Sequence, residues 1–80
     1  MKLSIYSIQN TLFEGECEKV IAHTPEGQIT ILAHHIPLVT RLVGPMLTAV
    51  DRNAHSQDIP LNGGIMEVRP DSEILILVDA

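Results

Sequence analysis

The sequence predicts an all-β fold, a two-sheet β-sandwich of about nine or ten short, mostly antiparallel strands. Tyr6 and Phe13 are the only aromatic residues, so the core must be aliphatic, and the abundant Ile, Leu and Val favour strands. Turn signals recur at intervals of roughly 8 to 12 residues. No stretch has the periodicity of a helix of ordinary length. These features predict one domain over residues 1–80.

The N-terminal part of the chain alternates apolar and polar residues. Leu3 and Ile5 share one face of a strand that is expected over residues 2–7 and ends before Gln9-Asn10. Next we expect a short strand over residues 11–13, a turn at Glu14-Gly15-Glu16 and a strand over residues 18–23.

A turn, a strand and a proline-ended loop form the central stretch of the chain. Pro25 and Gly27 predict a reversal, because Pro presets a turn dihedral and Gly accepts positive φ. The alternating run over residues 28–31 predicts a strand. Pro37 has no amide hydrogen, so the ladder is predicted to be interrupted near His34-His35 before pairing resumes.

The second half of the chain contains five strand patterns, over residues 38–43, 46–50, 58–61, 65–68 and 74–78. Pro60 predicts an edge or a bulge for the strand that holds it. Asn62-Gly63-Gly64 is interpreted as a structural turn or bulge, or as a site of close strand packing. The last strand is apolar on both faces, which predicts a central strand that is covered on both sides. The residues predicted to be buried against a second sheet are Ile29, Ile31, Leu47, Ile74, Ile76 and Val78.

Charge and composition exclude several classes of function. The formal net charge is −5, the wrong sign for a protein that neutralises nucleic-acid phosphates. Cys17 stands alone, so it forms no internal disulfide, which is typical of a reducing compartment. No apolar run approaches the roughly 20 residues of a membrane span, and Met1 leads into a strand without a signal sequence. We therefore expect no nucleic-acid binding and no direct membrane insertion.

The sequence predicts no catalytic, cofactor-binding or metal-binding residues. His34 and His35 are adjacent in extended backbone, so their side chains point to opposite faces and do not chelate one ion together. The chain has neither a Gly-x-Ser-x-Gly elbow nor a phosphate-binding glycine loop. Glu16 and Glu18 flank Cys17 and are expected to raise the pKa of its thiol, which argues against a reactive nucleophile.

Interaction with a partner is the remaining class of function. Glu26, Gln28, His35 and Thr40 lie in or beside predicted loops, where partner contacts concentrate. One alternative is a free-standing β-sandwich interaction module. Another is a small hydrolase that uses His35 with a nearby carboxylate, although no nucleophile or oxyanion motif accompanies it.

A central block of the sequence, together with the stretches that precede and follow it, resembles the epsilon subunit of ATP synthase. The central block joins Gly27-Gln28-Ile29-Thr30-Ile31-Leu32 to His35-Ile36-Pro37-Leu38-Val39-Thr40. Leu12-Phe13-Glu14-Gly15-Glu16 precedes it, and Gly63-Gly64-Ile65-Met66-Glu67-Val68 and Ile76-Leu77-Val78-Asp79-Ala80 follow it. Two positions depart from the pattern: Ala33 stands where the family usually has Pro, and His34 where it often has Asn or Gly.

The resemblance implies a non-catalytic central-stalk subunit of the rotary, proton-translocating ATP synthase. Such a subunit couples the gamma subunit to the membrane c-subunit ring, and it sits peripherally on the cytoplasmic side of the bacterial plasma membrane. Carried over position by position, the resemblance implies gamma contacts at Ser7, His35 and Thr40. It implies ring contacts at Glu26, Gly27 and Gln28.

The family usually has a helical hairpin after this domain, and the sequence ends at Ala80, before that point. In the family, tight ATP binding and inhibition of the motor belong to those helices. The resemblance therefore implies that residues 1–80 couple two partners without binding ATP tightly.

Overall fold

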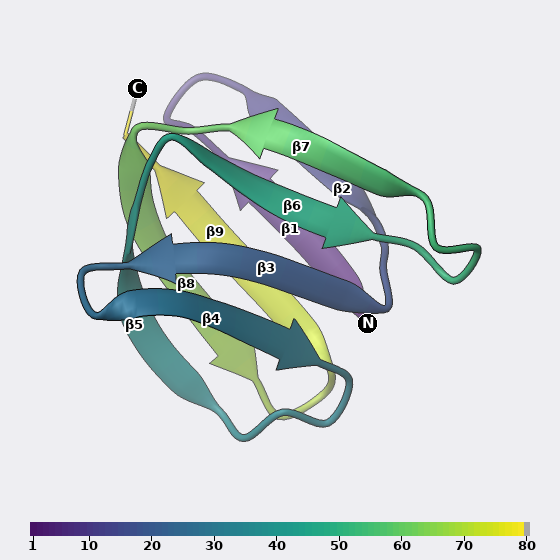
Figure 1. Ribbon diagram of the computed structural model, residues 1–80. Helices are drawn as coiled ribbons and strands as arrows, with labels where there is room; N and C mark the ends of the chain where they lie inside the picture. Colours follow the sequence, from purple (N-terminus) through teal and green to yellow (C-terminus); the bar gives the residue numbers. More distant parts are fainter. Residues whose placement is uncertain (80) are drawn as a thin grey trace.

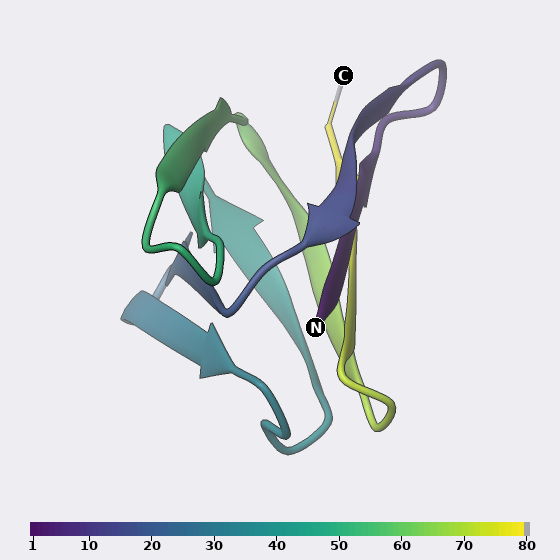
Figure 2. The same cartoon turned by 90° about the vertical axis from the view of Figure 1, so that its right-hand side faces the viewer.

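The computed structural model describes residues 1–79, which form two β-sheets packed face to face (Figures 1 and 2). The five-stranded sheet contains, in spatial order, β2 (Thr11–Glu16), β1 (Lys2–Tyr6), β9 (Glu73–Val78), β8 (Gly63–Arg69) and β5 (Leu38–Val43). The four-stranded sheet contains β4 (Gly27–Leu32), β3 (Lys19–Thr24), β6 (Met46–Val50) and β7 (Ser56–Pro60). Neighbouring strands are antiparallel except for β1 and β9, which are parallel. The predicted all-β sandwich is confirmed.

The core lies between the sheets and is aliphatic, as the composition predicts. Alternate residues of each strand face inward, so both sheets contribute to one cluster. The largest fully buried side chains are Leu3, Ile5, Val20, Ile31, Leu42, Leu47, Met66, Ile74 and Ile76. Of the six residues predicted to be buried, five are buried, and Ile29 is partly buried against the same cluster. Ile29 lies on the edge strand β4, two residues from the exposed Gly27 at the β3–β4 turn.

β2 is longer than the sequence predicts. We expected a turn at Glu14-Gly15-Glu16, but the strand continues through these residues to Glu16. Gly15 lies opposite Leu3 in a ladder that pairs β2 with the whole of β1. The hydrogen-bonded ladder of this hairpin therefore outweighs the turn preference of Gly15.

Two adjacent glycines begin β8, where the sequence suggests a turn or bulge. Gly63 pairs with Val43 and Gly64 with Leu42, so both are strand residues. They have φ values of 145° and 159°, which side chains rarely adopt. A Cβ atom on Gly64 would overlap the Leu77 carbonyl oxygen and lie 2.9 Å from the Val78 Cα. Close strand packing therefore explains Gly64, whereas at Gly63 it is the positive φ that favours glycine.

β9 is central, as predicted, because it lies between β1 and β8. The expectation that both of its faces are covered is wrong. Ile74, Ile76 and Val78 face the core, whereas Leu77 points outward and is 54% exposed. Among residues 1–79 no element packs over this outer face. The edge position predicted for the strand that holds Pro60 is confirmed by β7.

Candidate partner-binding surfaces

The connection between β4 and β5 is a compact turn that displays apolar side chains. His35 donates its backbone N–H to the Leu32 carbonyl at 3.2 Å, and Nδ1 of its ring lies 2.7 Å from the Ile36 carbonyl oxygen. His34 has a φ of 66°, in the left-handed region that Gly and Asn enter most readily. Leu32 and Ile36 are both more than half exposed.

The turn between β3 and β4 is exposed and held by one threonine. Thr24 Oγ1 accepts a hydrogen bond from the Glu26 N–H at 3.2 Å and donates one to the Gly27 carbonyl at 2.9 Å. Gly27 has a φ of 126°, which supports the predicted use of glycine at this reversal. Gln28 follows on β4, opposite His23. The three residues implied to meet the ring, Glu26, Gly27 and Gln28, thus share one exposed tip.

Ser7, His35 and Thr40 are not brought together. Ser7 follows β1 in the connection to β2, and its N–H and hydroxyl both bond to Asn10. His35 lies in the β4–β5 connection at the opposite end of the sandwich (Figures 1 and 2). Thr40 is opposite the buried Met66, so it is half-buried on the core side of β5. Three strand spacings separate β1 from β5, which is about 14 Å.

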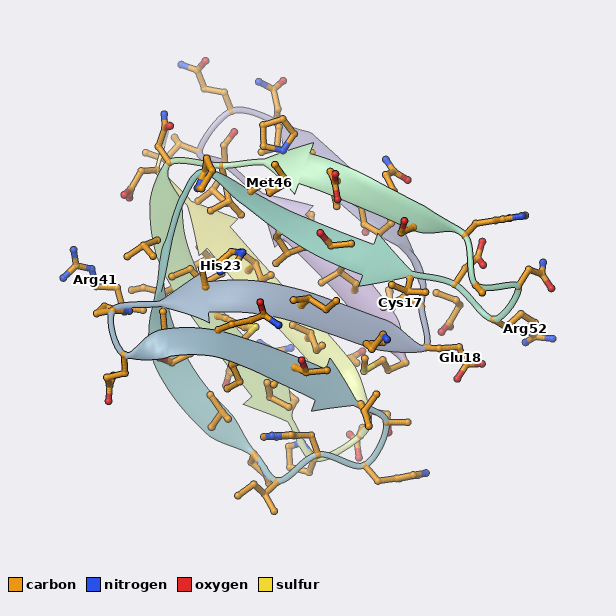
Figure 3. All side chains as sticks on the ribbon, viewed as in Figure 1. Cys17, Glu18, His23, Arg41, Met46 and Arg52 are labelled. Carbon is orange, nitrogen blue, oxygen red and sulfur yellow. The ribbon has the colours of Figure 1, made fainter. Side chains whose placement is uncertain are left out.

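The outer face of the five-stranded sheet carries an apolar area that the sequence analysis did not assign to a partner. Val39 on β5, Ile65 on β8 and Leu77 on β9 all point outward and are more than half exposed. Ile65 lies opposite both Leu77 and Arg41. In Figure 3, Arg41 extends away from the sandwich. The signal in the sequence was the apolar character of both faces of the last strand.

Residues 1–79 contain no grouping of three or more His, Cys, Asp or Glu side chains with the geometry to hold a metal ion. Cys17 is buried beside the β6–β7 turn, and burial is the main cause that raises the pKa of its thiol. Glu16 and Glu18 raise this pKa further, in the direction that the sequence predicts, while the positive charge at residue 1 lowers it. Sequence reasoning thus found the direction but missed the main cause. The described residues also include no helix with the length and apolar character that a membrane crossing requires.

A comparison with known protein families shows which family this chain belongs to. The family described as ATP synthase, Delta/Epsilon chain, beta-sandwich domain matches residues 1–80. The chain belongs to this family. The stretches that carried the resemblance lie on β2, on β4, β5 and the connection between them, and on β8 and β9.

Individual relatives agree with this membership. The chain is 35% identical to the ATP synthase epsilon chain of Chromobacterium violaceum over 99% of its length, and 35% identical to that of Dehalococcoides mccartyi over 100%. It is 34% identical to the epsilon chain of Xanthomonas oryzae pv. oryzae over 99% of its length. In each case the match spans 56% of the relative, so this chain covers little more than half of those proteins.

Solved structures share the fold. A chain in the OSCP/F1/c-ring structure of the Euglena gracilis mitochondrial ATP synthase superposes with a TM-score of 0.88 at 19% identity. The match covers 95% of this chain and 48% of that one. A chain in the central stalk/c-ring structure of the Tetrahymena thermophila mitochondrial ATP synthase superposes with a TM-score of 0.78 at 19% identity. This match covers 99% of this chain and 63% of that one. At this identity the likeness concerns the fold alone.

Proposed function

We propose that this domain is a non-catalytic rotor element of the rotary, proton-translocating ATP synthase, which couples the gamma subunit to the membrane c-subunit ring. The observation that carries the proposal is the match of the family to the whole of residues 1–80. The epsilon chains of three bacteria, each at least 34% identical to it, support the same reading. In this role the domain acts as one unit, sits peripherally on the cytoplasmic side of the bacterial plasma membrane and reaches the membrane only through its partners.

The packing of the sandwich suits a mechanical role. Both sheets contribute to one continuous aliphatic core, and close-packed interiors have low compressibility and transmit strain. No buried side-chain polar atom among the described residues lacks a hydrogen-bond partner. A domain of this kind carries torque between two rotor parts with little internal deformation, while the chemistry takes place elsewhere in the complex.

Two surfaces are available for the two partners. The β3–β4 tip, with Glu26, Gly27 and Gln28, is proposed to meet the ring, because it is narrow and exposed. Ser7 and His35 are proposed to touch gamma directly, and Thr40, which faces the core side of β5, is proposed to support that contact from within the sheet. Since Ser7 and His35 lie at opposite ends of the sandwich, a gamma contact that includes both extends along the whole five-stranded sheet.

Co-purification tests the proposal. The chain is expressed with an affinity tag in the organism that encodes it, and membranes are solubilised in a mild detergent. Gamma and c subunits are expected to elute with the tagged chain at a fixed ratio. A free-standing interaction module would elute without either subunit, and that result would overturn the proposal. Hydrolysis of a panel of ester and phosphate substrates by the purified chain would instead support the hydrolase alternative.

A further inference from the structure

Asn62 belongs to the glycine-rich connection between β7 and β8, but its side chain takes no part in the packing of the domain. The residue is exposed and directly precedes Gly63, the first residue of β8. Among residues 1–79 no hydrogen bond holds its side-chain amide. Asparagine is one of the thermolabile residues of proteins, and its chemistry depends on the residue that follows it.

Gly63 places an unhindered backbone nitrogen next to the Asn62 side chain. Glycine has no Cβ atom, so nothing shields its nitrogen from the preceding side chain. The Gly63 carbonyl oxygen accepts a hydrogen bond from the Asp79 N–H at 3.1 Å. In an extended strand the N–H and C=O of one residue point to the same neighbour, so the Gly63 N–H is also directed at β9 and not at β5. Within residues 1–79 the reciprocal bond, from the Gly63 N–H to the Asp79 carbonyl, is not formed.

The other two asparagines of the chain lack this combination. Asn53 precedes Ala54, whose N–H donates a hydrogen bond to the Asp51 carbonyl at 3.1 Å and is therefore engaged. Asn10 precedes Thr11, whose branched and stiff side chain crowds the backbone nitrogen. Neither neighbour offers a nitrogen that is both unhindered and unengaged.

We propose that Asn62-Gly63 is a site of spontaneous modification, at which the Asn62 amide is converted to aspartate and isoaspartate. The Gly63 nitrogen loses its proton to water and forms a bond to the Asn62 Cγ, while the bond from Cγ to Nδ2 breaks and ammonia leaves. Water then opens the cyclic imide. Cleavage between the nitrogen and Cγ gives aspartate, and cleavage between the nitrogen and the backbone carbonyl carbon gives isoaspartate. Water is the only co-reactant, and the inference goes beyond the proposed function and does not depend on it.

The packing around the connection determines what isoaspartate does to the domain. This product runs the backbone through Cβ and Cγ of residue 62, so it adds one methylene group to the connection. Leu61, before it, is buried, and its N–H bonds to the Pro45 carbonyl at 3.0 Å. Gly64, after it, lies against β9 with no room for a Cβ atom. Because both ends of the segment are fixed by close packing, the longer backbone must break one of these contacts.

Aspartate differs from isoaspartate in this respect. It leaves the length of the backbone unchanged and adds only a carboxylate at an exposed position, where solvent screens the charge. The Asn62→Asp variant therefore isolates the effect of charge, and the difference between the two products isolates the effect of backbone length.

Incubation of the purified chain at mildly alkaline pH tests the site. Mass spectrometry of peptides follows the conversion of amide to acid, and an isoaspartate-specific methyltransferase reports the second product. The peptide with Asn62 is expected to convert at least about tenfold faster than those with Asn53 or Asn10, because only there is the nitrogen positioned for attack. Asn62→Gln is expected to abolish the conversion, since its side chain would have to close a larger ring. Equal rates at the three asparagines, or conversion of Asn62 in urea but not in the folded chain, would overturn the proposal.

Thermal melts of the separated products test the structural consequence. The aged chain is fractionated by ion exchange, and Asn62→Gln serves as a reference that does not age. The aspartate product and Asn62→Asp are expected to melt within about 2 °C of the unmodified chain, and the isoaspartate product at least about 4 °C lower. An isoaspartate product that melts with the aspartate product would show that the connection accepts the longer backbone, and would overturn this part of the inference.

Discussion

Gly64 illustrates how one residue can determine the spacing of two strands. Its φ of 159° and the close approach of the Leu77 carbonyl and the Val78 Cα leave no room for a side chain. We predict that Gly64→Ala lowers the free energy of unfolding by at least about 2 kcal/mol, because β8 and β9 must move apart. Urea denaturation measures the change.

Gly15→Ala is the control for this prediction. Gly15 also lies in a strand, but its φ is not in the positive region, and a Cβ atom there would be in ordinary contact with the Phe13 ring at 3.4 Å. The substitution is expected to change stability by less than about 1 kcal/mol. Similar losses at Gly15 and Gly64 would contradict the close-packing explanation.

Cys17 makes stability depend on pH in the alkaline range. Burial raises the pKa of its thiol above the ordinary value of 9.0, so the folded state favours the neutral thiol. The unfolded chain releases this proton first, so the contribution of Cys17 is complete below the ordinary pKa and is lost as the pH rises towards the folded value. We predict that the unsubstituted chain loses more stability between pH 8 and pH 10 than Cys17→Ala does. Stability at each pH is measured by urea denaturation. Equal losses of stability for the two proteins over this pH range would contradict the prediction.

Thr40 is half-buried and faces the core side of β5, opposite Met66. We predict that Thr40→Glu destabilises the fold itself by about 1–3 kcal/mol, because it places a carboxylate beside apolar side chains. Asn53→Glu, in the exposed β6–β7 turn, is expected to have an effect of less than about 0.5 kcal/mol. Thermal melts compare the two variants. Equal melting temperatures would show that Thr40 points to solvent and that a charged substitution there reports on gamma binding alone.

At the scale of elements, the two faces of β9 have different roles. Ile76 is fully buried between the sheets, whereas the next residue, Leu77, is on the outer face. We predict that Ile76→Ala costs about 2–5 kcal/mol of stability, since it leaves a cavity, and that Leu77→Ala costs less than about 1 kcal/mol. Chemical denaturation of both variants gives the comparison. Comparable losses would indicate that the outer face is covered within the domain.

Local sequence signals predicted the limits of those strands that have a turn signal at each end. β5 and β6 have the predicted limits, because Pro37 precedes one and Gly44-Pro45 separates the two. The extent of β2 was not predictable in this way, because Gly15 continues the strand only through its pairing with β1. β7 begins at Ser56, earlier than predicted, since Val50 pairs with Ser56 across the β6–β7 turn.

The candidate surfaces were predictable only in part. The exposed β3–β4 tip follows from Pro25 and Gly27, whose turn preferences are local. The exposure of the apolar outer face was not predicted. A continuous apolar run shows that both faces of a strand are apolar, but it does not show whether a second layer or a partner covers them. The separation of Ser7 from His35 likewise depends on strand order, which a single sequence does not contain.

At the scale of the whole molecule, the central claim is that this sandwich couples two rotor parts without chemistry of its own. A measurement of proton pumping tests it most directly. Membrane vesicles are prepared from cells depleted of the epsilon subunit, and ATP-driven acidification is followed with a fluorescent probe as the chain is added back. We predict that acidification rises to saturation at one chain per motor, while the chain alone hydrolyses no ATP. Continued ATP hydrolysis without acidification at saturating chain would contradict the coupling role.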